Sequence, residues 1–262
     1  MKLLWMFPDI LNLHGDRGNV MALSSIARAM GLNLEIVKAS DADSVPDPGG
    51  VDLVLLGAGQ LRDMPTVAEA LSPLREAFRS YAEAGGAVLA TGSGGCLLGT
   101  AFYPEGGEPC EGLGLLDMTA RELCRTAQPM LTKEVYGDDI YWRAEDGTEI
   151  IGCQIQRMDF TLGADCRPLG ETLYGYGNDL SGAEGAKIGN VLFTNTVGPL
   201  LACAPWFGVK LLSGIAERRG EDISGFREED VPFMAYARAS FSKKRAFILE
   251  KKKLPGIVNK LS

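Results

Sequence analysis

The stretch AVLATGSGGCLLGTAF (87–102) carries the strongest fold signal in the chain. It begins with a short apolar run typical of a buried strand (87–91), passes through a glycine-rich turn, and continues into a short helix that we expect to start near Gly95. In enzymes with a sharp strand-to-helix turn of this kind, the turn holds a reactive side chain above the sheet, and nearby backbone N–H groups stabilise an oxyanion. The stretch therefore predicts a candidate site at one edge of a sheet.

Apolar segments elsewhere have the length and composition of further strands. The run DLVLLG (52–57) is apolar almost throughout, as in a strand that is buried on both faces of a parallel sheet. We predict further strands at 2–7, 34–39, 149–155 and 190–195, and helices that end at Gly31 and span 66–84, with a polar loop at 12–19 and a glycine-rich stretch at 173–185. Because strand, loop and helix alternate, we expect an α/β fold with a mainly parallel central sheet.

Composition and charge exclude several classes of protein. The net charge of −8 argues against a general nucleic-acid-binding protein, since such a protein is basic over its binding surface. The six cysteines form no CxxC pair, no secretory leader is evident, and no run of 18 or more residues is apolar. We therefore expect no disulfide framework, no zinc site and no membrane span. The expected location is the cytoplasm.

The end of the chain differs from the rest in charge. Residues 243–262 contain seven lysines and arginines and one glutamate. No linker or repeat divides the remainder, so we predict a single domain (1–242) followed by a basic C-terminal tail (243–262). A solvated helix end with a frayed tail is a better interpretation of this segment than a dedicated anion-binding arm.

The single histidine limits the possible chemistry. Histidine is the usual proton shuttle near neutral pH. Because His14 is the one histidine in the sequence, any Cys-His or Ser-His mechanism must use it or be absent.

Five further segments, in order along the chain, carry a resemblance to a known protein family. They are FPDILNLHGDRGNVMAL (7–23), GAGQLRD (57–63), EGLGLLD (111–117), TLYGYGND (172–179) and EGAKIGNVLFTNTVGPLL (184–201). Together with the turn at 92–99, they resemble the class I glutamine amidotransferase domains of the cobyric acid synthase (CobB/CobQ-type) group. Within that group, the resemblance is greatest to the amidotransferase subunits of lipid II isoglutaminyl synthase.

This resemblance implies a fold, an activity and a partner. The fold would be the three-layer class I glutamine amidotransferase-like (flavodoxin-like) fold. Intact members hydrolyse glutamine and pass ammonia to an ATP-dependent, Mur-ligase-like synthetase that amidates a carboxyl group in cell-wall or cobalamin-type metabolism. ATP would belong to that partner, and because the chain has no P-loop or convincing metal cluster, we expect no cofactor or metal.

The chain departs from the family at the residues that perform glutamine hydrolysis. The family's nucleophilic cysteine, in I-C-G-G-Y-Q-L-L-G, aligns with Gly92, and its histidine, in Y-L-H-G-P, aligns with Val197. A second family segment, G-F-E-N-H, aligns with residues 152–156. Glycine cannot form a thioester and valine cannot carry a proton, so the alignment predicts a protein without glutaminase activity that scaffolds or regulates its synthetase.

The alignment also predicts which residues surround the vestigial pocket, where a glutamine-like small molecule could bind. They are Gly57, Gly59, Gly92, Ser93, Cys96, Gln154, Gln156 and Val197. The glycines among them are also explained by the backbone turns in which they lie.

Two alternatives to the inactive subunit remain open. Cys96 follows Gly92 by about one helical turn and could serve as a relocated nucleophile, although a free cysteine is more often a small buried apolar residue. Ser93 would lack a base, His14 is expected to be a loop residue, and Asp9 and Asp16 are expected to form caps and turns. Alternatively, the chain could be a small-molecule sensor that uses the vestigial pocket without an obligatory protein partner.

Overall fold

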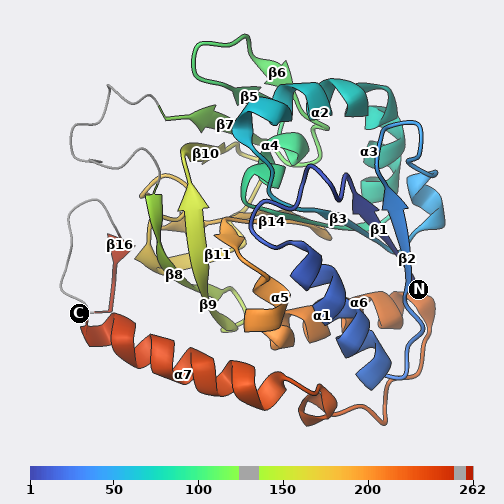
Figure 1. The fold of residues 1–262 in the computed structure, drawn as a ribbon, viewed down its shortest axis with the longest axis vertical. Coiled ribbons are helices and arrows are strands. Elements are labelled where there is room, and N and C mark those ends of the chain that lie inside the picture. The colour runs from blue at the N-terminus through green and yellow to red at the C-terminus, as the bar shows by residue number, and fades with distance from the viewer. Residues whose placement is uncertain (124–135, 251–257, 262) are drawn as a thin grey trace.

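The central sheet is six-stranded and mainly parallel, as predicted (Figure 1). The computed structural model describes residues 1–123, 136–250 and 258–261. Across the sheet the strands are β13 (Ala186–Ile188), β14 (Val191–Thr194), β4 (Ala87–Thr91), β3 (Leu53–Leu56), β1 (Lys2–Met6) and β2 (Glu35–Ala39). Every neighbouring pair from β2 to β14 is parallel, and β13 forms an antiparallel hairpin with β14 at the edge. The order β2-β1-β3-β4-β14 is that of a doubly wound, flavodoxin-like sheet.

Helices cover both faces of this sheet and make the architecture three-layered. One face is covered by α1 (Arg17–Ala29), α5 (Leu200–Cys203) and α6 (Pro205–Arg219), and the other by α2 (Met64–Leu71), α3 (Arg75–Glu83) and α4 (Gly95–Leu98). Successive side chains of a strand point to opposite faces. In β1, Leu3 and Trp5 therefore pack with α1 and α6, whereas Leu4 and Met6 pack with the helices on the other face. Burial on both faces explains why these strands are apolar at every position.

The chain after β4 adds two sheets that the sequence interpretation does not predict. One has the order β10-β7-β5-β6, formed by β5 (Ala101–Tyr103), β6 (Cys110–Glu111), β7 (Met118–Glu122) and β10 (Met158–Leu162). The other has the order β12-β11-β8-β9-β15, formed by β8 (Tyr136–Ala144), β9 (Glu149–Gln156), β11 (Gly170–Gly175), β12 (Ala183–Glu184) and β15 (Thr196–Val197), with β16 (Val258–Asn259) paired to β11. We refer to the second of these as the β8–β9 sheet. The glycine-rich stretch predicted at 173–185 thus contains the end of β11 and all of β12.

The predicted helix at 66–84 is in fact two helices. Between α2 and α3 lies a 3₁₀ turn, Ser72–Leu74. Pro73 has no N–H to continue the helical ladder, and its ring would clash with the carbonyl of Glu69, so α2 ends at Leu71. The other 3₁₀ turns are Pro48–Gly50, Leu61–Asp63, Gly92–Gly94 and Glu228–Asp230.

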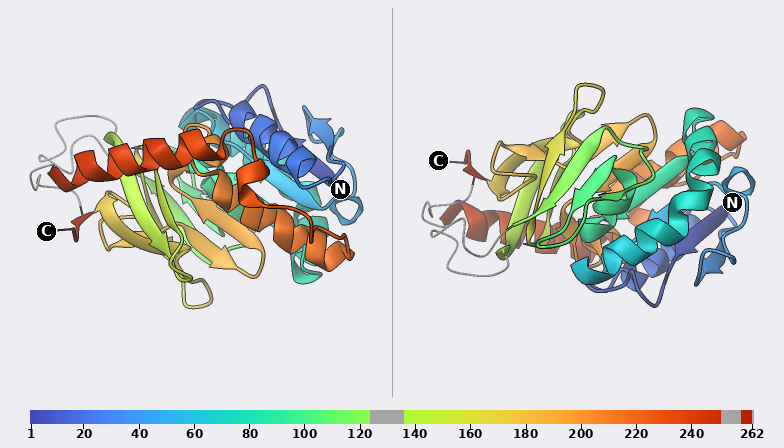
Figure 2. Two further views of the ribbon diagram at one scale, coloured as in Figure 1. Left: turned by 90° about the horizontal axis from the view of Figure 1, so that it is seen from below. Right: turned by 90° about the horizontal axis from the view of Figure 1, so that it is seen from above.

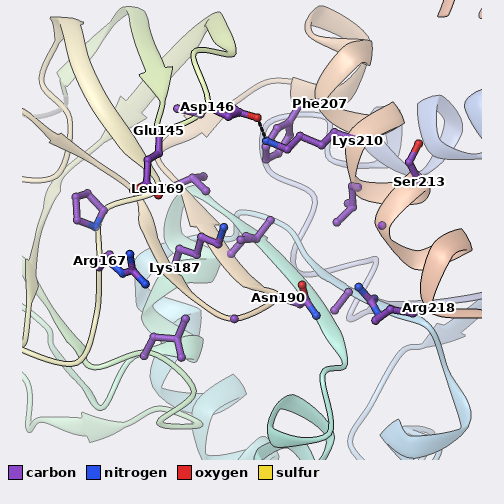
Figure 3. Close-up of a pocket in the computed structure, with 18 of the residues that line it drawn as sticks. Glu145, Asp146, Arg167, Leu169, Lys187, Asn190, Phe207, Lys210, Ser213 and Arg218 are labelled. Atoms are coloured by element: carbon purple, nitrogen blue, oxygen red, sulfur yellow. Dashed lines mark hydrogen bonds and ion pairs between the residues drawn. The ribbon is translucent and has the colours of Figure 1, made fainter.

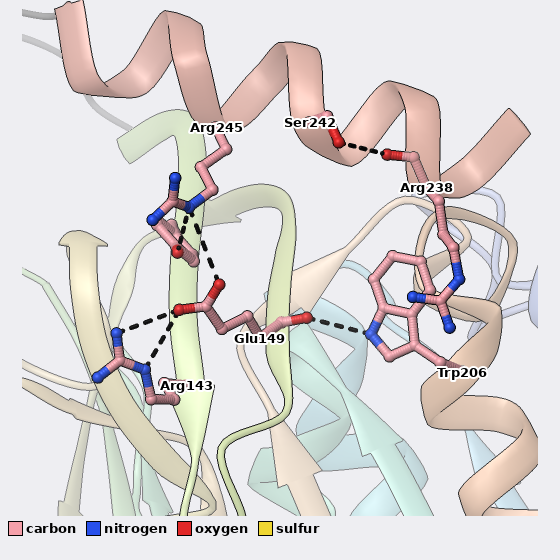
Figure 4. Close-up of polar contacts among 7 residues, drawn as sticks. Arg143, Glu149, Trp206, Arg238, Ser242 and Arg245 are labelled. Carbon is pink, nitrogen blue, oxygen red and sulfur yellow. Dashed lines mark hydrogen bonds and ion pairs between the residues drawn. The ribbon is translucent and has the colours of Figure 1, made fainter. Parts of the chain in front are cut away.

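The last long helix, α7 (Met234–Glu250), is the red helix in Figure 2, and residue 243, where we place the start of the basic tail, falls within its bounds. It packs on β9, α5 and α6. The Phe241 ring meets the Tyr141 ring edge-on at a centroid distance of 6.1 Å, and Arg245 Nε donates to the Tyr141 hydroxyl at 3.1 Å. Arg245 also lies 3.9 Å from a carboxylate oxygen of Glu149 (Figure 4). Residue 243 therefore lies inside a helix that is anchored to the β8–β9 sheet.

A second set of contacts anchors the first half of α7. The Trp206 indole donates to the backbone carbonyl of Glu149 at 3.1 Å, and the Arg238 guanidinium lies over the Trp206 ring at 5.4 Å (Figure 4). Phe241 completes this group with an edge-on contact to Trp206.

Over the described part of the chain, no helix has both the length and the apolar character needed to cross a lipid bilayer.

Candidate functional site

Four loop segments meet at the carboxyl end of the central sheet. They are the opening loop after β1, the loop at 57–60 after β3, the turn at 92–95 after β4 and the turn at 197–199 after β15. The crevice outside the carboxyl ends of the strands is where open α/β sheets bind their ligands. The candidate site therefore lies among these four segments.

Gly92 has the backbone of a strained strand-to-helix turn. Its φ of +52° lies in the left-handed region, which only glycine adopts without steric cost. A Cβ atom added to Gly92 would lie 2.6 Å from Cγ1 of Val197 and 3.1 Å from Cβ of Ala58. The structure thus brings together the two positions that the alignment assigns to the family's cysteine and histidine.

Val197 is fully enclosed and carries no group that can exchange a proton. It belongs to the two-residue strand β15, in which Val197 pairs with Cys153 and Thr196 pairs with Gln154 of β9. The indole N–H of Trp142 donates to the Thr196 hydroxyl at 2.9 Å and fixes this short strand. The position opposite Gly92 is therefore rigid and apolar.

Ser93 closes the loop that follows β3. Its hydroxyl donates to the carbonyl of Gly59 at 2.6 Å and accepts from the N–H of Gly59 at 2.8 Å. In enzymes with a nucleophile turn, one oxyanion donor is an N–H of the loop that faces the turn. Here the Gly59 N–H already has a partner in Ser93, so it is not free to bind a developing oxyanion.

Asp16 is a buried residue of the site whose role the sequence interpretation missed. We expected a helix cap, and Asp16 does occupy the N-cap position of α1, but its side chain makes no capping hydrogen bond. It instead accepts from the Thr91 hydroxyl at 2.7 Å and from the Ala58 N–H at 3.2 Å. Burial raises the pKa of the Asp16 carboxyl, although these hydrogen bonds oppose the rise. Asp16 thus ties the opening loop to β4 and to the loop after β3.

The space for Asp16 depends on a glycine. A Cβ atom at Gly57 would lie 2.2 Å from the carbonyl oxygen of Leu11 and 2.7 Å from the side chain of Asp16. The motif GAGQLRD therefore has a structural reason for its first glycine, as the sequence interpretation allowed. Asp9, by contrast, is exposed in a turn.

His14 is half-buried in the opening loop, two residues before Asp16. Burial lowers the pKa of its imidazole, and the nearby Asp16 carboxylate opposes that change. The neutral form is thereby favoured.

Cys96, the fallback nucleophile, is a core residue. Its thiol is 2% exposed and donates to the Met158 sulfur at 3.2 Å. Burial raises the pKa of the Cys96 thiol well above its ordinary value. Reactive cysteines have the opposite character, with a lowered pKa and partial exposure.

Gln154 and Gln156 serve the turn at 176–177. Gln154 donates to the carbonyl of Gly177 at 2.7 Å and accepts from the N–H groups of Tyr176 and Gly177. Gln156 donates to the carbonyls of Met158 and Gly177, and its own amide oxygen is buried without a hydrogen-bond partner among the described residues. Both side chains that we predicted to line the pocket are thus committed to holding a backbone turn.

A buried carboxylate network, also missed by the sequence interpretation, supports the segment that leads to Val197. Glu184 is fully buried and accepts from the Thr194 hydroxyl at 2.6 Å and from the backbone and side chain of Asn195 at 2.9 and 2.8 Å. Asn195 also donates to Asn178 at 2.7 Å. Burial raises the pKa of Glu184, against the effect of these hydrogen bonds. The sequence carries little local signal for this network, because Asn178 and Asn195 lie outside the strands and Glu184 ends a two-residue strand.

Comparison with known proteins supports the assignment made from sequence. No family model matches the chain. It is 26% identical over 234 residues to the lipid II isoglutaminyl synthase (glutamine-hydrolyzing) subunit GatD of Streptococcus pneumoniae, covering 88% of this chain and 86% of that protein. It is 27% identical over 213 residues to the subunit of the same name from Staphylococcus aureus, covering 81% and 83%. The chain resembles the glutamine amidotransferases. A solved glutamine amidotransferase with 16% identity covers 80% of this chain and 98% of its own, with a TM-score of 0.51, which confirms the predicted fold.

Proposed function

We propose that this chain is a glutamine amidotransferase-like subunit without glutaminase activity, which scaffolds or regulates an ATP-dependent, Mur-ligase-like amidating synthetase. The observation that carries the proposal is the contact between the Gly92 position and Val197. At the turn where the family places its nucleophile there is no side chain, and the neighbouring position is aliphatic.

The chemistry of glutamine hydrolysis cannot proceed on these residues. A thiolate must attack the carboxamide carbon, and a base must then deliver a proton to the departing ammonia. Gly92 offers no sulfur and Val197 offers no proton. Removing one member of such a unit costs several orders of magnitude in rate, and here two are missing.

Relocated nucleophiles have little support from the structure. The Cys96 thiol is enclosed in the core beside Met158. The Ser93 hydroxyl uses its proton and accepts a hydrogen bond at Gly59. An active glutaminase that uses Cys96 therefore remains an outcome of the test and is not the favoured function.

The subunit role rests on the relatives. Both are named as subunits of a lipid II isoglutaminyl synthase, and the chain covers most of each. The buried supports of the site, Asp16 and Glu184, keep the shape of the carboxyl end of the sheet. A retained shape without the reactive residues suits a subunit whose remaining task is binding.

The test measures which nitrogen source the complex uses. The chain would be purified together with a Mur-ligase-like synthetase of the same organism, and amidation would be measured with ammonium chloride and with glutamine. We expect amidation from ammonium, faster or longer-lived when the chain is present, and no amidation from glutamine. Glutamine-dependent amidation that is lost in Cys96→Ala would contradict the proposal, as would a synthetase that neither binds the chain nor responds to it.

A further inference from the structure

A cavity of about 850 Å³ lies at the end of the central sheet opposite to Gly92. It is lined by Ala87 at the start of β4 and by Asn190 just before β14, whereas Gly92 follows the other end of β4. The length of the strand separates the two places by about 13 Å. The cavity is therefore independent of the vestigial amidotransferase site and of the function proposed for it.

The floor of the cavity is apolar. Leu169 and Phe207 belong to the buried core, and Leu192 and Leu211 pack against it. On α6 the lining residues Phe207, Leu211, Gly214 and Arg218 recur at spacings of three and four and so share one face of the helix. A cavity of this size whose apolar floor is bordered by charged side chains suits a small molecule that has both an apolar body and a charged group.

Two cations form one wall of the cavity (Figure 3). Arg167 and Lys187 are directly opposite each other in an antiparallel bridge, with Lys187 N–H donating to the Arg167 carbonyl at 2.7 Å and the reverse bond at 3.3 Å. Side chains directly opposite in such a pair lie on the same face, and like charges there repel each other. An anion bound between them would replace this repulsion with two favourable contacts.

The charges around this pair are arranged so that it stays available. Across the cavity Arg218 projects from α6, beside Asn190 (Figure 3). Lys210 is paired with Asp146. Glu145, Asp165 and Glu217 also line the cavity, yet within residues 1–123, 136–250 and 258–261 none of them forms an ion pair with Arg167, Lys187 or Arg218.

We propose that this cavity, hereafter the Arg167–Lys187 site, binds a small organic anion. Its phosphate or carboxylate group would lie between Arg167 and Lys187, and its apolar body would rest on Leu169, Leu192 and Phe207. Arginine offers a planar fork that matches either acid group, and the lysine adds a mobile charge. Arg218 is placed to meet a second polar group at the far end of the ligand.

Four simple probes separate the parts of this proposal. They are phenyl phosphate, benzoate, benzyl alcohol and inorganic phosphate, titrated into the full ¹⁵N-labelled chain while amide chemical shifts are followed. We expect phenyl phosphate or benzoate, or both, to bind in the millimolar range, with shifts centred on residues of the cavity; the stronger of the two identifies the acid group. Benzyl alcohol lacks the charge and inorganic phosphate lacks the apolar body, so each should bind at least several-fold more weakly.

A pair of charge-matched variants completes the test. Arg167→Ala/Lys187→Ala should weaken binding of the preferred anion about tenfold or more, as expected for loss of charge-assisted hydrogen bonds. Arg28→Ala/Lys243→Ala removes the same charge at exposed positions elsewhere and should leave binding unchanged. Equal weakening in both variants, shifts outside the cavity, or no binding of either organic anion by the wild-type chain would overturn the proposal.

Discussion

At the scale of single residues, Gly92 and Val197 have complementary shapes. The space that a side chain at 92 would need is filled by Val197, whose Cγ1 lies 2.6 Å from the position of the missing Cβ. Restoring a cysteine at 92 would therefore require a smaller or differently oriented side chain at 197. The residues at the two positions that the alignment assigns to the family's cysteine and histidine thus pack directly against each other.

The first prediction concerns this packing. Gly92→Ala should lower the free energy of unfolding by about 3 kcal/mol, since it combines an unfavourable positive φ with overpacking against Val197. Urea unfolding would measure this free energy. The double variant Gly92→Ala/Val197→Ala should lose less unfolding free energy than the two single variants lose in sum. Gly50→Ala, at a glycine with no atom within 4 Å of its added Cβ, is the control. Additive losses would show that the two positions do not share this space.

The second prediction concerns the Ser93 hydroxyl. Ser93→Ala leaves the N–H and the carbonyl of Gly59 without their partners in a buried loop, which should cost about 1–3 kcal/mol of unfolding free energy. Ser240→Ala on the exposed surface of α7 should change stability by less than about 0.5 kcal/mol. A midpoint of urea unfolding that is the same for both variants would contradict the role given to Ser93.

At the scale of elements, the carboxyl ends of β1, β3 and β4 are joined through Asp16. Its side chain accepts hydrogen bonds from Ala58 and Thr91, which lie 42 and 75 positions away in the sequence. No local pattern reveals such a link, which is why the sequence indicated only a cap. The break between α2 and α3 at Pro73, by contrast, is visible in the sequence, because proline inside a helix is a local signal that the helix ends. The apolar periodicity over 66–84 outweighed this signal in the prediction of one helix.

The third prediction follows from the raised pKa of Asp16. A carboxyl whose folded pKa exceeds its unfolded value stabilises the fold below the unfolded pKa, and that stabilisation is lost as the pH rises through the folded pKa. The stability of the wild-type chain relative to Asp16→Asn should therefore fall as the pH rises from about 4 towards 7. Urea unfolding across this range, in a His14→Gln background so that the imidazole does not titrate, would measure it. A difference that grows with pH would show that the carboxylate form is the stabilised one.

At the scale of the whole molecule, the parallel sheet was predictable and the two later sheets were not. The strands β1, β3 and β4 are buried on both faces and read as continuous apolar runs. Strands such as β11 and β12 are held by long-range pairing and contain glycines that resemble a loop. For the proposed site, the resemblance pointed to Gly92 and Val197, whereas the hydrogen-bond partners of Ser93, Asp16 and Glu184 could be identified only in the folded chain.

The fourth prediction concerns the boundary at residue 242. A chain that ends there loses Ile248, which is 1% exposed, and the contacts of Arg245 with Tyr141 and Glu149. We expect its free energy of unfolding to be about 3 kcal/mol lower than that of the full chain, mainly because apolar burial is lost. A chain that ends at 250 keeps α7 and separates this effect from removal of the remaining basic residues. Equal stability of the 1–242 chain and the full chain would instead favour an independent tail.

We propose that the carboxyl end of the sheet presents no reactive nucleophile, and covalent trapping tests this proposal independently of reaction rate. The chain would be incubated with a diazoketone analogue of glutamine, which alkylates a catalytic thiol, and its intact mass measured, with the Streptococcus pneumoniae relative as the positive control. The structure predicts an unmodified mass for this chain. A mass increase that maps to Cys96 and disappears in Cys96→Ala would contradict it.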